Sequence, residues 1–277
     1  MKLIVLADNR CTDASLETEH GLCLYVETNT TRYLLDTGRT DVFIRNAERL
    51  GVDLTAVDYV FLSHAHADHT GGLEAFLALN ETATVLLHPA VISNRYFSSR
   101  QGGFRDISLP FDLTPWLHRC RLVEEDLLLE DGTFIYACHT EKFATPKANV
   151  TLWKGALPDP QRDTFDHELM LVVGGTNGLL YTGCAHKGLL NMLAETSGRG
   201  LTPGWVVGGF HLLDSLPGHL YEDAETIHHI AEWLSADYPD THFLTGHCTG
   251  DAVFERMKTL MGAHLHQFYT GLRQIMA

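Results

Sequence analysis

Ten residues, 63–72, constrain the fold and the chemistry of this chain more than any other segment. They read Ser-His-Ala-His-Ala-Asp-His-Thr-Gly-Gly and place four side chains that can bind a metal ion within six residues: His64, His66, Asp68 and His69. Imidazole and carboxylate donors together suit Zn²⁺, Fe or Mn better than Ca²⁺, which prefers oxygen donors alone. Two histidines at i and i+2, followed by Asp and His at i+4 and i+5, cannot easily surround one tetrahedral ion. We therefore expect them to divide between two adjacent ions.

The residues on either side place this segment between a strand and a helix. Residues 58–62 form a short apolar run with aromatic and β-branched side chains, which is typical of a buried strand. Gly71 and Gly72 permit a tight turn, and residues 73–79 have helical composition. The alternative is a polar loop whose histidines share no role, since the chain holds 17 histidines. A loop held by a rigid strand is, however, where functional residues concentrate.

Charge limits the partners that we expect. The 277 residues include 20 Lys and Arg against 35 Asp and Glu, which gives a net charge of −15. No run rich in Lys or Arg is present to replace the counterions of nucleic acid or to bind an anionic membrane, so we expect neither partner. An anionic substrate stays compatible with the charge, because bound metal ions can reverse the local field.

The chain shows no targeting or membrane segment by pattern. The apolar run at the start is too short for a signal peptide and is broken by Asp8. No stretch of about 18 apolar residues predicts a membrane span. The six cysteines have no disulfide-framework spacing, so we interpret them as reduced thiols of a cytoplasmic protein.

The pattern Ser-His-x-His-x-Asp-His-x-Gly-Gly resembles the signature of the metallo-β-lactamase fold superfamily of metal-dependent hydrolases. The resemblance implies an α+β fold, a four-layer αββα sandwich in which two facing mixed β-sheets are flanked by helices. It spans nearly the whole chain, so we expect a single domain over residues 1–277. Residues 94–118 are rich in Ser, Gly and Pro and predict an irregular insertion or lid. Its arginines, Arg95, Arg100 and Arg105, form either an anion-binding cap or a solvated surface.

A hairpin precedes the metal loop. Two apolar runs, residues 22–28 and 32–36, flank the polar residues 29–31 and predict this hairpin. In the resembled superfamily an Asp-x-Gly turn after the hairpin lies beneath the metal loop. The resemblance implies that the Asp36 carboxylate supports the metal ligands without binding the metal itself, since a ligating histidine needs a hydrogen-bond partner for its other ring N–H. The alternative is that Asp36 is only a turn residue.

The second half of the chain repeats the order of strand, tight turn, candidate ligand and helix. Apolar residues 179–181 lead through Gly183 to Cys184 and His186. The repeat predicts one β-rich unit used twice, with the two sheets facing each other. We select His186 as the third ligand of the first ion. Cys184 stands where many superfamily members have an Asp that bridges both metals, and its thiolate either binds a metal or only lies near one.

Two later strand ends also carry histidines. The strand at residues 205–207 ends in a Gly-rich turn and His211, which we interpret as a substrate-facing or acid/base group, with a structural role as the alternative. His247 follows a strand at residues 241–244, where the superfamily brings its final ligand. Because superfamily members often take a ligand from this half of the chain, His139 and His167 are further candidates.

Together these motifs predict a binuclear metal-dependent hydrolase with two divalent cations, Zn²⁺ favoured over Mn²⁺ or Fe. The first site would be His64, His66 and His186, and the second Asp68, His69 and His247. A metal-bound hydroxide would attack a phosphoester or an ester or lactone, with Asp68 and His211 as catalytic residues. We expect the substrate to be a small molecule, and phosphorylated molecules are among the candidates. A homo-oligomer is also compatible with the sequence.

Two alternatives remain open. The motifs Glu19-His20-Gly21, Gly208-Gly209-Phe210-His211 and His247-Cys248-Thr249-Gly250 resemble one subgroup of the superfamily. Its members are commonly labelled 7,8-dihydropterin-6-yl-methyl-4-(β-D-ribofuranosyl)aminobenzene 5′-phosphate synthase, which implies a transferase. The other alternative is a di-iron redox or sensing protein, because the superfamily also carries di-iron sites and Cys184 could tune one.

Overall fold

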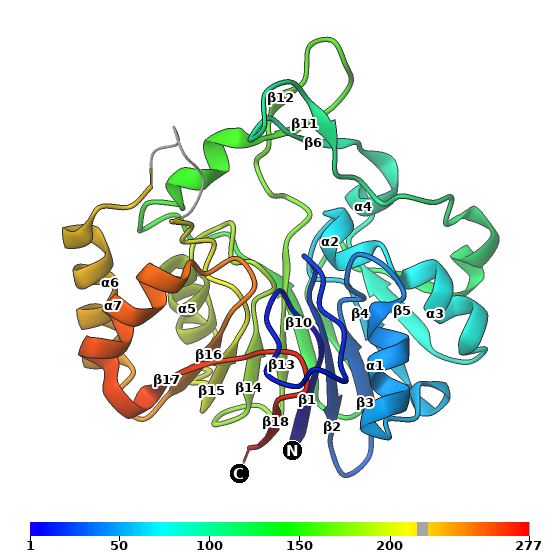
Figure 1. Ribbon diagram of the computed structural model, residues 1–277, viewed down its shortest axis with the longest axis horizontal. Coiled ribbons are helices and arrows are strands. Elements are labelled where there is room, and N and C mark those ends of the chain that lie inside the picture. Colours follow the sequence, from blue (N-terminus) through cyan, green and yellow to red (C-terminus); the bar gives the residue numbers. More distant parts are fainter. Residues whose placement is uncertain (215–220, 277) are drawn as a thin grey trace.

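Two β-sheets face each other, and helices cover the outer face of each sheet (Figure 1). The computed structural model describes residues 1–214 and 221–276. The α+β fold with four αββα layers that the sequence predicts is confirmed.

The first sheet has an antiparallel half and a parallel half. Its order, among the described residues, is β18-β1-β2-β3-β4-β5-β8. Pairing is antiparallel from β18 to β3 and parallel from β3 to β8. The strands are β1 Lys2–Ala7, β2 Cys23–Glu27, β3 Arg32–Leu35, β4 Tyr59–Phe61, β5 Thr84–Leu87, β8 Cys120–Leu122 and β18 Arg273–Ile275.

The second sheet repeats this plan. Its order in the described part of the chain is β17-β16-β15-β14-β13-β10-β9, antiparallel from β9 to β14 and parallel from β14 to β17. The strands are β9 Leu127–Leu128, β10 Phe134–Ala137, β13 Leu169–Val173, β14 Leu179–Tyr181, β15 Trp205–Val207, β16 His242–Thr245 and β17 Leu265–Gln267. The shared succession agrees with the prediction of one unit used twice.

Helices follow the parallel strands and pack on the outer faces. They are α1 Val42–Leu50, α2 Ala67–Thr70, α3 Leu73–Leu79, α4 Ala90–Ser93, α5 Leu189–Gly198, α6 Ala224–Asp237 and α7 Asp251–Met261. Short 3₁₀ turns are η1 Leu54–Ala56, η2 Thr114–Arg119, η3 Lys147–Thr151 and η4 Gly262–His264. Helix α6 begins after Asp223, which caps it by accepting a hydrogen bond from the Thr226 N–H.

The core lies in three layers, and the strands show why. In β1, Leu3 and Val5 point into the cluster between the sheets, whereas Ile4 and Leu6 point toward the helices of the first sheet. A third cluster joins the second sheet to α5, α6 and α7. Strands buried on both faces are expected to be continuously apolar, and β1 is apolar from residue 3 to residue 7. No helix among the described residues is both long enough and apolar enough to cross a bilayer.

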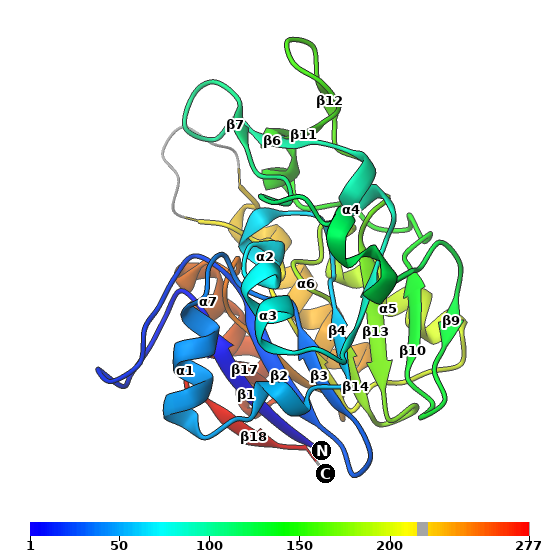
Figure 2. The same cartoon turned by 90° about the vertical axis from the view of Figure 1, so that its right-hand side faces the viewer.

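A small third sheet lies above the edge where the ligand loops meet (Figure 2). Its order is β12-β11-β6-β7, with β6 Tyr96–Ser98, β7 Arg105–Asp106, β11 Leu152–Lys154 and β12 Gln161–Arg162. We call residues 94–106 and 152–162 the cap. The prediction that residues 94–118 are irregular is wrong for β6 and β7, because such short strands depend on pairing with a distant segment and leave no periodic pattern. The extent of the insertion stays a prediction.

Candidate metal centre

The ligand candidates lie on loops at one edge of the two sheets. Leu35 pairs with Phe61 in parallel register, so the loops after β3 and β4 leave the first sheet side by side. Strands β14, β15 and β16 are also parallel and in register. The loops at residues 182–188, 208–212 and 246–250 therefore leave the second sheet together. The two sets of loops meet beneath the cap (Figure 1).

Three histidines form what we call the first group: His64, His66 and His186. They are at most 4% exposed, and one nitrogen of each lies within 4.8 Å of the others. The Nε2 atoms of all three are buried without a hydrogen-bond partner. Burial holds the pKa of His64 and His186 well below the usual 6.5, so these rings are neutral at pH 7.

Asp68, His69 and His247 form the second group. Their donor atoms also lie within 4.8 Å of one another, but they contact each other directly. His69 Nε2 is 3.2 Å from His247 Nε2, which is 3.5 Å from Asp68 Oδ2. Burial lowers the pKa of His247, but the hydrogen bond with Asp68 outweighs it and raises the pKa to about 9. Burial likewise opposes the charge of Asp68, yet His247 and the neighbouring imidazoles hold its pKa well below 3.8.

Asp36 joins the two groups from beneath, in the place that the sequence predicts. Its carboxylate accepts hydrogen bonds from the Ser63 N–H at 2.7 Å, the Ser63 hydroxyl at 2.7 Å and the Tyr181 hydroxyl at 2.6 Å. It also lies 2.6 Å from His69 Nδ1. The Ser63 hydroxyl is in turn 2.9 Å from His64 Nδ1. One buried carboxylate thus orients a ring of each group.

Two asparagines hold one histidine of each group in the same way. Asn149 Oδ1 is 3.2 Å from His186 Nδ1, and its Nδ2 donates to the His186 carbonyl at 2.8 Å. Asn9 Oδ1 is 3.1 Å from His247 Nδ1, and its Nδ2 donates to the His247 carbonyl at 3.0 Å. An oxygen at Nδ1 fixes the proton there and leaves the Nε2 lone pair for a metal. Sequence reasoning did not find Asn149, because no motif surrounds it.

Glu168 was also missed by sequence reasoning as a residue of the site. Its carboxylate is 1% exposed and accepts hydrogen bonds from the His186 N–H at 2.7 Å and the Lys187 N–H at 2.8 Å. Burial raises its pKa to about 8. Glu168 therefore fixes the backbone of the loop that carries His186.

His167 supports the first metal loop through both ring nitrogens. Its Nδ1 accepts a hydrogen bond from the Ala65 N–H at 3.1 Å, so the proton lies on Nε2, which donates to Asp163 at 3.1 Å. This arrangement leaves no lone pair for a metal, although Asp163 Oδ2 lies 3.7 Å from His66 Nε2. His139 is exposed and belongs to none of the donor clusters found in the described residues.

Cys184 lies between the two groups. Its sulfur is 3.1 Å from His69 Nε2, and it forms a donor cluster with His64 and His69, one residue from each group. A further cluster joins Cys184 to Cys248 and His211, and the Cys248 thiol donates to the Cys184 carbonyl at 3.7 Å. Both predictions for Cys184, ligand or close neighbour, are compatible with this position.

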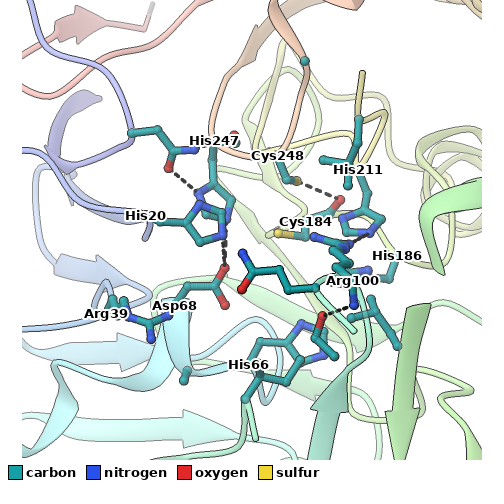
Figure 3. A pocket seen from close by; sticks show the side chains of 18 of the residues that line it. His20, Arg39, His66, Asp68, Arg100, Cys184, His186, His211, His247 and Cys248 are labelled. Atoms are coloured by element: carbon teal, nitrogen blue, oxygen red, sulfur yellow. Dashed lines mark hydrogen bonds and ion pairs between the residues drawn. The ribbon is translucent and has the colours of Figure 1, made fainter. Parts of the chain in front are cut away.

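A cavity of about 690 Å³ opens onto the groups and the cap. Figure 3 shows His66, Asp68, His186 and His247 around it, with Arg100 entering from the cap. Its lining includes Arg10, Arg39, Arg100 and Arg105. It also includes the carboxylates Asp68, Asp214 and Asp251, so arginines outnumber carboxylates there by one, whereas carboxylates prevail in the protein as a whole.

The ligand loops of the two halves touch through a glycine. A Cβ on Gly183 would lie 2.4 Å from the Ser63 hydroxyl oxygen, so no larger residue fits without movement. Several residues here also adopt a left-handed backbone that non-glycine residues rarely use, which is common at functional sites. They are Asp36, Ala185, His211 and His247.

The donors fit divalent metal ions. The three Nε2 atoms of the first group are buried polar atoms that native proteins rarely leave without a partner. Imidazole nitrogens with a carboxylate suit Zn²⁺, Fe or Mn.

The match to the Metallo-beta-lactamase superfamily model covers residues 17–188, and the chain belongs to this superfamily. It is 24% identical over 253 residues to an uncharacterized protein of Methanocaldococcus jannaschii, which covers 87% of this chain and 88% of that protein. It is also 24% identical over 252 residues to the 7,8-dihydropterin-6-methyl-4-(beta-D-ribofuranosyl)-aminobenzene-5′-phosphate synthase of the same organism, covering 84% of this chain and 82% of that one.

A solved structure extends the likeness to the whole fold. The crystal structure of Tm1679, described as a metal-dependent hydrolase of the beta-lactamase superfamily, matches with a TM-score of 0.81 at 27% identity. The match covers 99% of this chain and 98% of that chain. The chain thus has the family and the fold of metal-dependent hydrolases.

Proposed function

We propose that this protein is a hydrolase that uses two divalent cations to cleave a small-molecule phosphoester, ester or lactone. Zn²⁺ is the favoured cation, with Mn²⁺ or Fe as alternatives. The observation that carries the proposal is the convergence of three buried, unpartnered imidazole nitrogens from His64, His66 and His186. The superfamily match and the likeness to a metal-dependent hydrolase support it.

The first group would hold one cation and the second group the other. Two divalent cations there would bring the pKa of a bound water to about 7 and stabilise the negative charge that develops on the attacked group. Asp68, whose side chain is 18% exposed and lines the cavity, would orient the attacking water. His211 would face the substrate from the opposite wall. Asp36, Asn9 and Asn149 would keep the ring protons away from the metal-facing nitrogens.

A transferase activity is the second candidate. The observation that favours it is the 24% identity, over 84% of this chain, to a protein named as a dihydropterin-ribofuranosyl-aminobenzene-phosphate synthase. Such a reaction would use the same cavity and the same ligands. The absence of hydrolysis in the screen below, together with transfer to a dihydropterin acceptor, would favour this candidate.

The test combines metal analysis with a substrate screen. The protein is loaded with Zn²⁺ or Mn²⁺, its metal content is measured, and bis-p-nitrophenyl phosphate and homoserine lactones are offered. We expect His66→Ala to lose more than about 100-fold of the turnover, since even residues that only support metal ligands cost up to about 100-fold. His139→Ala, a change at an exposed histidine, is the control and should match the wild type. Wild-type turnover by correctly folded His66→Ala would refute the assignment.

A further inference from the structure

Arg100 is the side chain that the cap extends toward the metal centre. It follows β6, and its guanidinium lines the cavity between His66, His186 and His211 (Figure 3). Its Nε donates to the hydroxyl of Thr151, the residue just before the second cap segment, at 3.0 Å. Its Nη2 donates to His211 Nε2 at 2.9 Å. The side chain is therefore held at both ends of its guanidinium group.

The contact with Arg100 determines which nitrogen of the His211 imidazole carries the proton. A guanidinium can only donate, so His211 Nε2 must accept and the ring must be neutral with its proton on Nδ1. The His211 ring lies 4.1 Å from the His186 ring, centroid to centroid. His211 thus holds Arg100 one ring away from the first group.

The cavity around Arg100 suits a negatively charged ligand. Four arginines and three carboxylates, Asp68, Asp214 and Asp251, line the cavity. Arg100 is among the deeper arginines, whereas Arg39 and Arg105 are exposed at its margin. Arg10 is paired with Asp251 at 2.7 Å. Cations held by the two groups would repel a guanidinium fixed beside them, and a negatively charged ligand between them would offset that repulsion. A planar guanidinium matches the oxygens of phosphate better than a neutral carbonyl.

We propose that Arg100, held by His211 and Thr151, is a specificity-determining residue that binds the anionic oxygens of a phosphate ester and so selects phosphoesters over neutral esters and lactones. This inference rests on the proposed function, because it concerns the same cavity. It makes His211 a positioning residue for Arg100.

The first experiment measures binding without turnover. Inorganic phosphate is titrated into metal-loaded protein by calorimetry, for the wild type, Arg100→Gln, Arg100→Lys and Arg95→Gln. A charge-assisted hydrogen bond contributes about 1.5–3 kcal/mol, so Arg100→Gln should bind phosphate about 10- to 100-fold more weakly, with Arg100→Lys in between. Arg95 is paired with Asp106 on the outside of the cap, 61% exposed, and its variant should bind like the wild type. Equal phosphate affinity in Arg100→Gln and the wild type would overturn the proposal.

A parallel titration with acetate separates the two sources of negative charge. We expect acetate to bind more weakly than phosphate in the wild type and to be less affected by Arg100→Gln. Acetate binding as tight as phosphate, with the same loss in Arg100→Gln, would overturn the assignment to phosphate esters.

The second experiment uses activity. For bis-p-nitrophenyl phosphate, Arg100→Gln should raise KM by about 10-fold or more, while turnover of a neutral homoserine lactone changes little. His211→Asn should show the same KM effect with an unchanged pH profile. A loss confined to kcat, with one ionisation missing from the pH profile, would instead make His211 the acid/base group. If no substrate is turned over, the proposed function fails, and the phosphate titration still decides the role of Arg100.

Discussion

The first and second groups contain similar donors in opposite states. In the first group three imidazole nitrogens converge without hydrogen-bond partners. In the second group His247 bonds to both His69 and Asp68. The comparison indicates that the first group depends on a cation to satisfy its buried nitrogens, whereas the second can be satisfied by a proton. The two groups should therefore differ in affinity and in pH dependence, although Asp36 supports both.

The largest effect is expected from changing Asp36, the carboxylate that supports both groups. Asp36→Asn keeps a residue that tolerates the left-handed backbone of this position, at φ +56°, but loses the charge. Several buried donors would lose their acceptor, so we expect unfolding to become easier by roughly 3–5 kcal/mol, as when one partner of a buried ion pair is removed. Urea unfolding of the metal-free protein measures this. Loss of one cation with unchanged stability would show that the groups are independent.

Removing one ligand should separate the groups. We expect His247→Asn to lose the cation of the second group and to retain that of the first, because His247 is not one of the donors of the first group. Asparagine again suits the backbone, which has φ +50° here. Metal content after dialysis and a competing chelator titration measure the result. Loss of both cations would contradict the comparison.

Acidity should affect the second group alone. The pKa of His247 is raised to about 9 from 6.5, so below pH 9 a cation must displace a proton there. Its affinity should fall by up to about tenfold for each pH unit below pH 9. In the metal-free protein, the stability from this raised pKa is fully present below pH 6.5 and is lost as the pH rises through about 9. The first group, whose His64 and His186 stay neutral, should show no such slope. Equal slopes in calorimetric titrations would contradict the difference.

Removing the asparagines that bond to the ligand histidines, Asn9 and Asn149, should have the smallest effect on metal affinity. Asn149→Ala should weaken the first cation by about 10-fold, and Asn9→Ala the second by a similar factor, because each frees one Nδ1. Each variant serves as the control for the other. A variant that weakens both cations equally would indicate a general loosening of the loops.

The site residues that could be predicted are those that belong to a recognisable pattern of neighbouring residues in the sequence. Residues 64–69 are recognisable because their donors are adjacent, and His186 and His247 because each follows a strand and a glycine. Asn149, Glu168 and the pairing of β6 with β11 were missed, because each depends on segments that meet only in the folded chain. The four layers were implied by the resemblance to the superfamily, and the facing sheets by the repeated order of strand, turn, ligand and helix. The cap strands, of two or three residues, are too short to show alternation.

The contact of Gly183 with Ser63 ties the centre to the interior of the protein. Because Gly183 lies so close to the Ser63 side chain that no Cβ fits between them, the spacing of ligands from the two sheets is coupled to the packing of the sheets. We therefore expect loop motion alone to change the spacing between the donors of the two groups very little. Enlarging a buried side chain between the sheets, such as Leu171, should thus change which ion radius the centre prefers, even though that residue binds no metal.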